Sequence, residues 1–198
     1  MNIKTELEKT VGYENTIQLN DIDLNPLTIR AVLINEIVPQ DPSQDFYGSP
    51  HAGYLSTTIP LFREAGLSVT KIQELLDLGI YITNAVKIPK TGYTVENCAL
   101  ERSLPYLEQE LSLFPQLQVI LLMGDVAKKA FNKITKKTMK KNIVPAISTY
   151  KLRKTELYSG NIRILPSYIM TGKNILIEKS KFAMAAEDIA LMLKLIQA

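Results

Sequence analysis

The stretch "LQVILLMGDVAKKAF", residues 117–131, decides the fold class. Its first half is an apolar run that stops at Gly124, which predicts a buried strand over 117–124. Asp125 is a residue type that commonly begins helices, so a helix is predicted from that point onward. A strand that is apolar along its whole length, followed directly by a helix, is typical of a parallel sheet with both faces covered.

The same pattern recurs along the chain. Three further apolar runs predict strands at 29–39, 79–86 and 161–170. Patterns with helical spacing lie between or after them, at 54–67, 68–79, 94–114 and 180–197. We therefore predict an α/β protein of three layers, α/β/α, with a central and mainly parallel four-stranded sheet.

The length of the chain predicts one domain spanning residues 1–198, because about 200 residues bury a single sizeable core. Residues 1–28 are interpreted as an N-terminal extension and 133–160 as a Lys-rich insertion.

Apolar residues make up 46% of the chain and charged residues 22%, as in ordinary globular proteins. No apolar run approaches the roughly 20 residues of a membrane span, and the polar start differs from a signal peptide. We expect a cytoplasmic protein with no membrane partner.

The sequence contains one cysteine, Cys98, and one histidine, His51. A zinc site needs three or four such ligands, so this chemistry is excluded, and no cofactor is expected. A Mg²⁺ site built from carboxylates stays open, although we predict no metal. The glycine-rich motifs that bind phosphates or dinucleotides are missing, as is the nucleophile elbow of hydrolases.

The basic residues are distributed unevenly. Between Val126 and Thr155 there are ten lysines and arginines and no acidic residue, although the net charge of the whole chain is only +3. This span is interpreted either as a solvated helix face and loop or as a seat for a phosphate backbone. The candidate backbone-binding residues are Lys136, Lys137, Lys140 and Lys141.

Polar and aromatic residues stand where the predicted strands end. Ligands of open parallel sheets bind beyond the carboxyl ends of the strands, here segments 35–54, 84–93, 124–128 and 166–176. An asparagine can pair with the edge of a planar ring such as uracil, and an aromatic residue can stack on the face of that ring. A carboxylate or amide can position a water. The residues of these types are Asn35, Glu36, Phe46, Tyr47, Asn84, Ser167 and Tyr168.

The asparagines, the two aromatic residues of 46–47 and Glu36 also have plain structural interpretations. An asparagine at a strand end is commonly a turn or cap residue. Phe46 and Tyr47 could fill the core, and Glu36 could be a surface or ion-pair residue.

Five segments, taken in their order along the chain, resemble the uracil-DNA glycosylase superfamily. The layout is most similar to the iron–sulfur-containing bacterial and archaeal branch of that superfamily. "YITNAVK" is similar to the strand that carries the base-recognising asparagine, and "LPYLEQELSLFPQLQVILLMGDVAKKAF" to a helix–strand–helix segment. "AVLINEIVP" stands where the first catalytic motif begins, "DFYGSPHAG" where an aromatic stacks on the flipped base, and "ILPSYIM" at the second catalytic motif.

The resemblance implies roles for individual residues. Asn84 would recognise the edge of the base, and Phe46, or alternatively Tyr47, would stack on it. Glu36 or Asn35 would position the attacking water. The base would be flipped out of the DNA into the pocket, and the basic span would hold phosphates.

The chain departs from the branch at several positions. Ile88 and Ser103 occupy positions where cluster cysteines are expected, so no iron–sulfur cluster should form. The second motif carries Ile169 where the family has a histidine that stabilises charge on the leaving base, and Met170 where it has a proline. Loss of one such donor typically lowers the rate on the order of 10²–10³-fold.

The resemblance therefore implies a DNA glycosylase-like protein that hydrolyses an N-glycosidic bond in base-excision repair, with DNA as its partner and weakened activity. A catalytically silent nucleic-acid-binding or interaction module on the same fold stays open. So does a hydrolase of a free nucleoside or nucleotide derivative. The sequence leaves the oligomeric state open.

Overall fold

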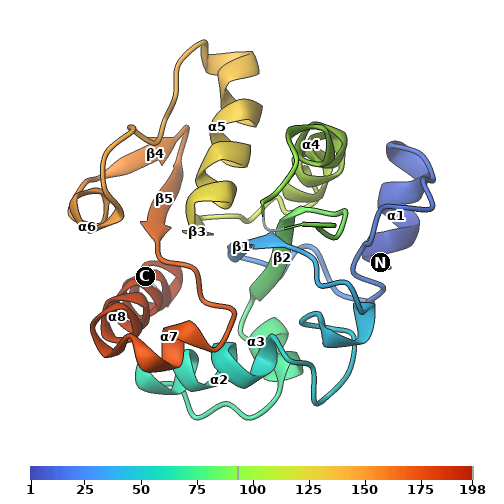
Figure 1. Ribbon diagram of the computed structural model, residues 1–198. Coiled ribbons are helices and arrows are strands. Elements are labelled where there is room, and N and C mark those ends of the chain that lie inside the picture. The colour runs from blue at the N-terminus through green and yellow to red at the C-terminus, as the bar shows by residue number, and fades with distance from the viewer. Residues whose placement is uncertain (93, 198) are drawn as a thin grey trace.

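The computed structural model describes residues 1–92 and 94–197. Its described residues form one sheet with the spatial order β2-β1-β3-β5-β4 (Figure 1). The strands are β1 (Ala31–Ile37), β2 (Ile80–Val86), β3 (Val119–Met123), β4 (Leu157–Ser159) and β5 (Ile162–Ser167). The four predicted strands are the four parallel ones, and β4 is an additional antiparallel strand at the edge. The α/β class is confirmed, with five strands where the sequence predicted four.

Helices cover both faces of this sheet, as a three-layer architecture requires (Figure 1). One face packs against α1 (Ile3–Thr10), α4 (Asn97–Ser112), α5 (Asp125–Met139) and α6 (Thr149–Leu152). The other packs against α2 (Leu55–Glu64), α7 (Asn174–Ile177) and α8 (Lys179–Gln197). The short helix α3 (Ile72–Asp77) leads into β2, and a 3₁₀ turn occupies Pro42–Gln44.

The core is divided by the sheet into two apolar clusters. Val32 and Ile34 of β1 belong to the cluster under α4 and α5, whereas Ala31 and Leu33 belong to the cluster under α2 and α8. Successive side chains of a strand point to opposite faces, so a strand covered on both sides must be apolar at every position. This explains the unbroken apolar runs in the sequence.

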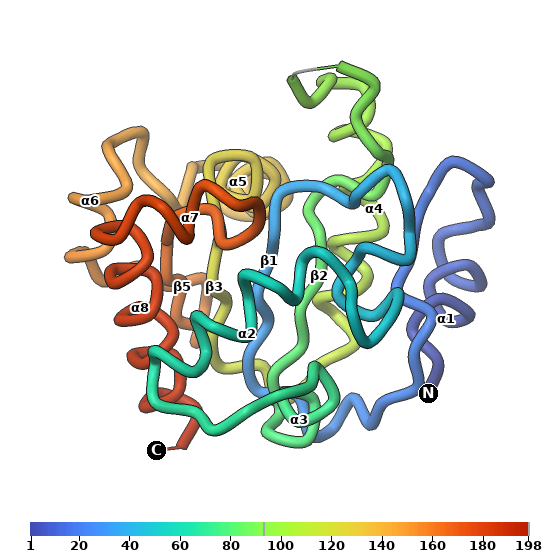
Figure 2. The backbone as a smooth tube through the Cα atoms, turned by 60° about the horizontal axis from the view of Figure 1, so that its bottom comes forward, coloured from blue at the N-terminus to red at the C-terminus, as the bar shows by residue number. Residues whose placement is uncertain are grey.

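The strand order indicates where along the sheet a ligand would bind. The chain leaves β1 to form β2 on one side and then β3 on the other, so the order reverses between β1 and β3. Such a reversal is where ligands bind in open parallel sheets. In Figure 2 the segment around α7 lies beside the start of α5, directly after β3.

The predicted N-terminal extension and the predicted Lys-rich insertion both contribute helices or strands to this architecture. Residues 1–28 include α1, whose Ile3 and Leu7 are fully buried in the core. The Lys-rich span 133–160 begins inside α5 and continues through α6 and β4. Within the described residues, no helix combines the length and apolarity needed to cross a membrane.

Candidate active site

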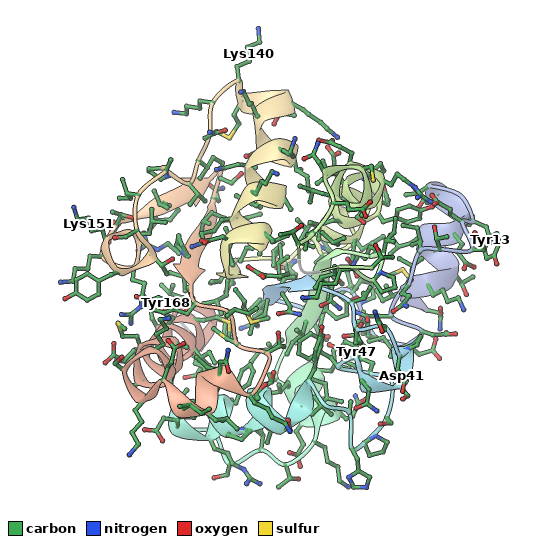
Figure 3. The ribbon with its side chains drawn as sticks, viewed as in Figure 1. Tyr13, Asp41, Tyr47, Lys140, Lys151 and Tyr168 are labelled. Carbon is green, nitrogen blue, oxygen red and sulfur yellow. The ribbon has the colours of Figure 1, made fainter. Side chains whose placement is uncertain are left out.

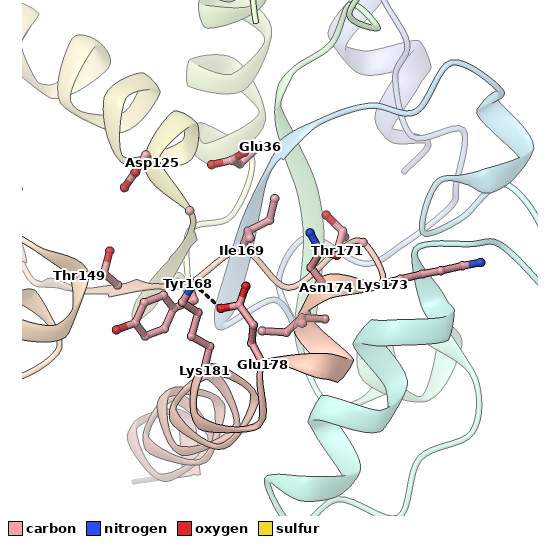
Figure 4. A pocket seen from close by; sticks show the side chains of 13 residues that line it. Glu36, Asp125, Thr149, Tyr168, Ile169, Thr171, Lys173, Asn174, Glu178 and Lys181 are labelled. Carbon is pink, nitrogen blue, oxygen red and sulfur yellow. Dashed lines mark ion pairs between the residues drawn. The ribbon is translucent and has the colours of Figure 1, made fainter. Parts of the chain in front are cut away.

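A cleft of about 510 Å³ opens where β1, β3 and β5 end (Figure 4). Its walls come from these strand ends, from the first residues of α5 and α6, and from the segment that includes α7 and the start of α8. This is the edge of the sheet that the strand-end argument predicted. The polar side chains lining it include Glu36, Asp125, Thr149, Tyr168, Thr171, Asn174 and Lys181.

Glu36 is the carboxylate best placed for chemistry in this cleft. The backbone N–H of Val126 donates to Glu36 Oε1 at 3.1 Å, so the start of α5 orients the carboxylate. The first N–H groups of a helix have no partner within the helix and favour a negative charge. Burial nevertheless raises the pKa of Glu36, opposed by the bond from Val126 and assisted by the nearby Asp125 carboxylate. A half-buried, oriented carboxylate with a raised pKa has the properties of a general base.

Gly124 makes this arrangement possible. It connects β3 to α5 with a φ of 97°, a conformation that side-chain-bearing residues rarely adopt. A Cβ at this position would also overlap the carboxylate of Glu36. A residue other than glycine would therefore displace the carboxylate from the start of α5.

Gly124→Ala is expected to destabilise the fold by more than the about 1–3 kcal/mol of the strained backbone conformation alone. Gly66→Ala is the matched control, since Gly66 has a φ of 101° and open space around its Cβ position. Urea unfolding of both variants gives the comparison. Equal losses of stability would show that the Glu36 carboxylate does not press against position 124.

Asn84 and Asn35 lie side by side on neighbouring strands, but both are buried. Asn84 Nδ2 donates to the two carboxylate oxygens of Asp45 at 3.0 and 2.8 Å. Asn35 Nδ2 donates to Asn84 Oδ1 at 2.7 Å, and Thr171 Oγ1 donates to Asn35 Oδ1 at 3.0 Å. These four side chains tie together β1, β2, the loop after β1 and the loop after β5.

These hydrogen bonds occupy the side-chain amides of both asparagines, which were predicted to bind a base or to position water. Both N–H donations of the Asn84 amide go to Asp45, whose pKa is raised by burial against the opposing bond from Asn84. Neither asparagine lines the cleft. Recognition of a base by Asn84 stays a prediction. It would require the hydrogen bonds of Asn84 to Asp45 and Asn35 to break. Of the two residues predicted to position water, only Glu36 faces the cleft.

Phe46 is a core residue in this structure, and Tyr47 is half-buried and packs against the core. Phe46 has no exposed surface and packs beside the ring of Tyr54, with 5.2 Å between the ring centroids. The Tyr47 hydroxyl accepts the backbone N–H of Ile82 at 2.9 Å, and its ring stacks on Tyr81 at 5.8 Å. Neither ring lines the cleft, so the stacking of Phe46 or Tyr47 on a base stays a prediction.

Ser167 and Tyr168 leave β5 in different directions. Ser167 is buried, and its hydroxyl donates to Asp188 of α8 at 2.5 Å, so it does not reach the cleft. Tyr168 lines the cleft, and Lys181 Nζ lies 6.0 Å from the centre of its ring. Ile169, at the position where the resemblance places a histidine, also lines the cleft and is 42% exposed.

The four predicted backbone-binding lysines lie away from the cleft, and their role in binding phosphates stays a prediction. Helix α5 starts at the cleft and runs for 15 residues, or about 22 Å at 1.5 Å per residue. Lys136 and Lys137 are in its last turn, and Lys140 and Lys141 follow it; Lys140 is at the far tip in Figure 3. Lys137 pairs with Glu108 of α4 at 2.6 Å.

The residues at the expected cluster positions do not fit an iron–sulfur centre, which needs four cysteine ligands. The Ser103 hydroxyl accepts the N–H of Lys87 and donates to the carbonyl of Ala99, as a structural residue does. Cys98 is exposed and is the one cysteine of the sequence. Within the described residues no three His, Cys, Asp or Glu side chains gather in a way that could hold a metal ion.

Several cleft residues were not named from the sequence. Asp125, Thr171 and Asn174 fall in segments 124–128 and 166–176, where the strand-end argument expects a site. Thr149 and Lys181 lie outside these segments and are brought to the cleft by packing of α6 and α8.

Residues 31–184 match the family model of the Uracil DNA glycosylase superfamily. The chain belongs to this superfamily. The match starts at β1 and ends inside α8, so it includes every strand of the described sheet and every residue lining the cleft. None of the curated proteins compared with the chain matches it. Members of this superfamily act on DNA.

Proposed function

We propose that this superfamily member hydrolyses the N-glycosidic bond of a nucleotide in DNA, and that the reaction takes place in the cleft at the carboxyl edge of the sheet. The observation that carries the proposal is the Glu36 carboxylate, which faces the cleft and is oriented by the start of α5. Membership of the superfamily supports the substrate class.

The proposed chemistry follows from the charges that develop during cleavage. As the N-glycosidic bond breaks, positive charge develops on the sugar and negative charge on the leaving base. The Glu36 carboxylate would stabilise the sugar cation and accept a proton from the water that attacks the sugar carbon. The cleft volume of about 510 Å³ suits one flipped nucleotide, since small-molecule sites range over about 300–1,000 Å³. Tyr168 and Asn174 are the polar side chains that we place beside the leaving base.

A catalytically silent DNA-binding module is the second candidate, and two observations favour it. Ile169 supplies no hydrogen-bond donor for the leaving base where the resemblance places a histidine. The Asn84 amide is engaged by Asp45 and Asn35 and does not face the cleft. Under this proposal the cleft would hold a nucleotide without cleaving it.

An excision assay separates the two candidates. The protein, in excess, is incubated with single- and double-stranded oligonucleotides carrying uracil, hypoxanthine or xanthine, and abasic sites are revealed by alkaline cleavage. We expect abasic sites with at least one modified base and none with the unmodified oligonucleotide. Salt-dependent binding without abasic sites would favour the silent module. Absence of both binding and cleavage would contradict both.

A further inference from the structure

Helix α6 forms one rim of the cleft and continues from it onto the outer surface. Its first residue, Thr149, lines the cleft on the same side as Tyr168 (Figure 4). The next residue, Tyr150, is 53% exposed, and Lys151 points outward on the flank of the molecule (Figure 3). We call Tyr150, Lys151 and Lys154 the α6 surface.

Two buried contacts fix α6 in this position. Lys128 of α5 is almost fully buried, and its Nζ donates to Thr149 Oγ1 at 2.6 Å. At the other end of the helix, Arg153 Nε donates to both carboxylate oxygens of Asp188 at 2.8 Å. Asp188 is buried in α8 and also accepts the Ser167 hydroxyl at the end of β5. The rim is therefore held at both ends and presents the α6 surface in one orientation.

The α6 surface combines an exposed aromatic ring with cations. Lys154 Nζ lies 4.7 Å from the centre of the Tyr150 ring. Among the described residues Lys151 is exposed and forms no ion pair within 4.0 Å. The sequence from 126 to 155 contains no acidic residue. The acidic residues around it that form ion pairs are Asp125 with Lys128, Glu156 with Arg163, and Glu187 and Asp188 with Arg153.

This combination fits an unpaired nucleic-acid strand. Proteins that bind single strands stack bases on exposed aromatic rings and hold the phosphates with nearby cations. A tyrosine has no base face to stack on in an intact duplex, whereas a strand unpaired around a flipped nucleotide offers such faces. The absence of acidic residues from the span around α6 favours a polyanion over a protein partner.

We propose that the α6 surface binds the unpaired DNA strand next to the nucleotide that enters the cleft. The proposal rests on the proposed function, because it takes the cleft as the place where the nucleotide enters. It assigns the phosphate contacts to Lys151 and Lys154, beside the cleft, and not to the lysines at the far end of α5.

The test compares two pairs of substitutions with the same change in charge. Lys151→Gln/Lys154→Gln alters the α6 surface, and Lys140→Gln/Lys141→Gln alters the tip of α5. Binding of a fluorescein-labelled polythymidine single strand is followed by anisotropy at several salt concentrations. We expect the α6 pair to weaken binding about tenfold and to reduce the salt slope by about 1.4, or about 0.7 for each lost phosphate contact. The α5 pair should change binding less than about threefold. Equal effects, or an effect of the α5 pair alone, would overturn the assignment.

Tyr150→Ala gives an independent readout of stacking. We expect it to weaken single-strand binding about fivefold or more, with a smaller effect on a duplex of the same sequence. An equal loss for both would overturn the stacking role. Polythymidine carries none of the modified bases of the excision assay, so a wild-type protein that binds it through α6 and excises none of those bases would refute only the proposed hydrolysis. If the α6 variants still excise and bind the single strand as the wild type does, only the proposed role of the α6 surface would be refuted.

Discussion

Glu36→Gln is expected to lower the single-turnover excision rate by a factor of about 10²–10⁴, the usual contribution of a general base. Glutamine keeps an oxygen that can accept the N–H of Val126, so the start of α5 should retain its partner. It has no carboxylate to accept the proton of the attacking water or to balance positive charge on the sugar. The rate is measured with excess protein on the modified base that the wild type excises.

Glu64→Gln is the matched control, because Glu64 is exposed at the end of α2 and does not line the cleft. It should excise at the wild-type rate. Wild-type excision by Glu36→Gln with an unchanged unfolding midpoint would remove Glu36 from the mechanism.

The pH profile gives a second signature of the same role. Burial raises the pKa of Glu36, so its proton is lost at higher pH than from an ordinary glutamate, whose pKa is about 4.3. Because the carboxylate form is the active one, the excision rate should be at its maximum above this raised pKa. The rate should fall as the pH decreases through it. An acid limb at or below the ordinary value would contradict the account.

Lys87→Met is expected to destabilise the fold by about 3–5 kcal/mol, the typical cost of leaving a buried charge without its partner. Lys87 Nζ lies 2.6 Å from Glu110 Oε2, and the two residues are 2% and 0% exposed. Thr83 and Tyr81 also donate to the Glu110 carboxylate, at 2.8 and 2.5 Å. Methionine removes the ammonium and leaves the carboxylate buried between β2 and α4.

The control is Lys137→Met, which breaks the exposed pair with Glu108. Exposed pairs typically contribute about 0–1 kcal/mol, so this variant should unfold close to the wild type in urea. Similar midpoints for Lys87→Met and Lys137→Met would show that the buried pair contributes no more than a surface pair.

The fold was predictable because its signals are local. A short apolar run such as 117–124, ended by a glycine, favours a strand covered on both faces. Gly124 and Asp125 mark the change to a helix. The edge strand β4 was missed, because Leu157–Ser159 is short and neither side of its pattern is fully apolar. Its pairing with β5 comes from tertiary contact, not from local preference.

The sequence predicted the location of the candidate site but not the directions in which its side chains point. Strand-end reasoning selected Glu36 and Tyr168, which face the cleft, but also Asn84 and Ser167, which do not. The direction of these side chains depends on partners far away in the sequence, Asp45 for Asn84 and Asp188 for Ser167. No local pattern identifies such partners. For the same reason the burial of Phe46 beside Tyr54 could not be predicted, and its stacking role stays a prediction.

The most direct test of the central claim is a crystal structure of the protein with an oligonucleotide that carries a non-hydrolysable analogue of the excised nucleotide. We expect the nucleotide to lie in the cleft between Glu36 and Tyr168, with its sugar beside the Glu36 carboxylate. A nucleotide bound elsewhere, with the cleft empty and Glu36 far from the sugar, would contradict it.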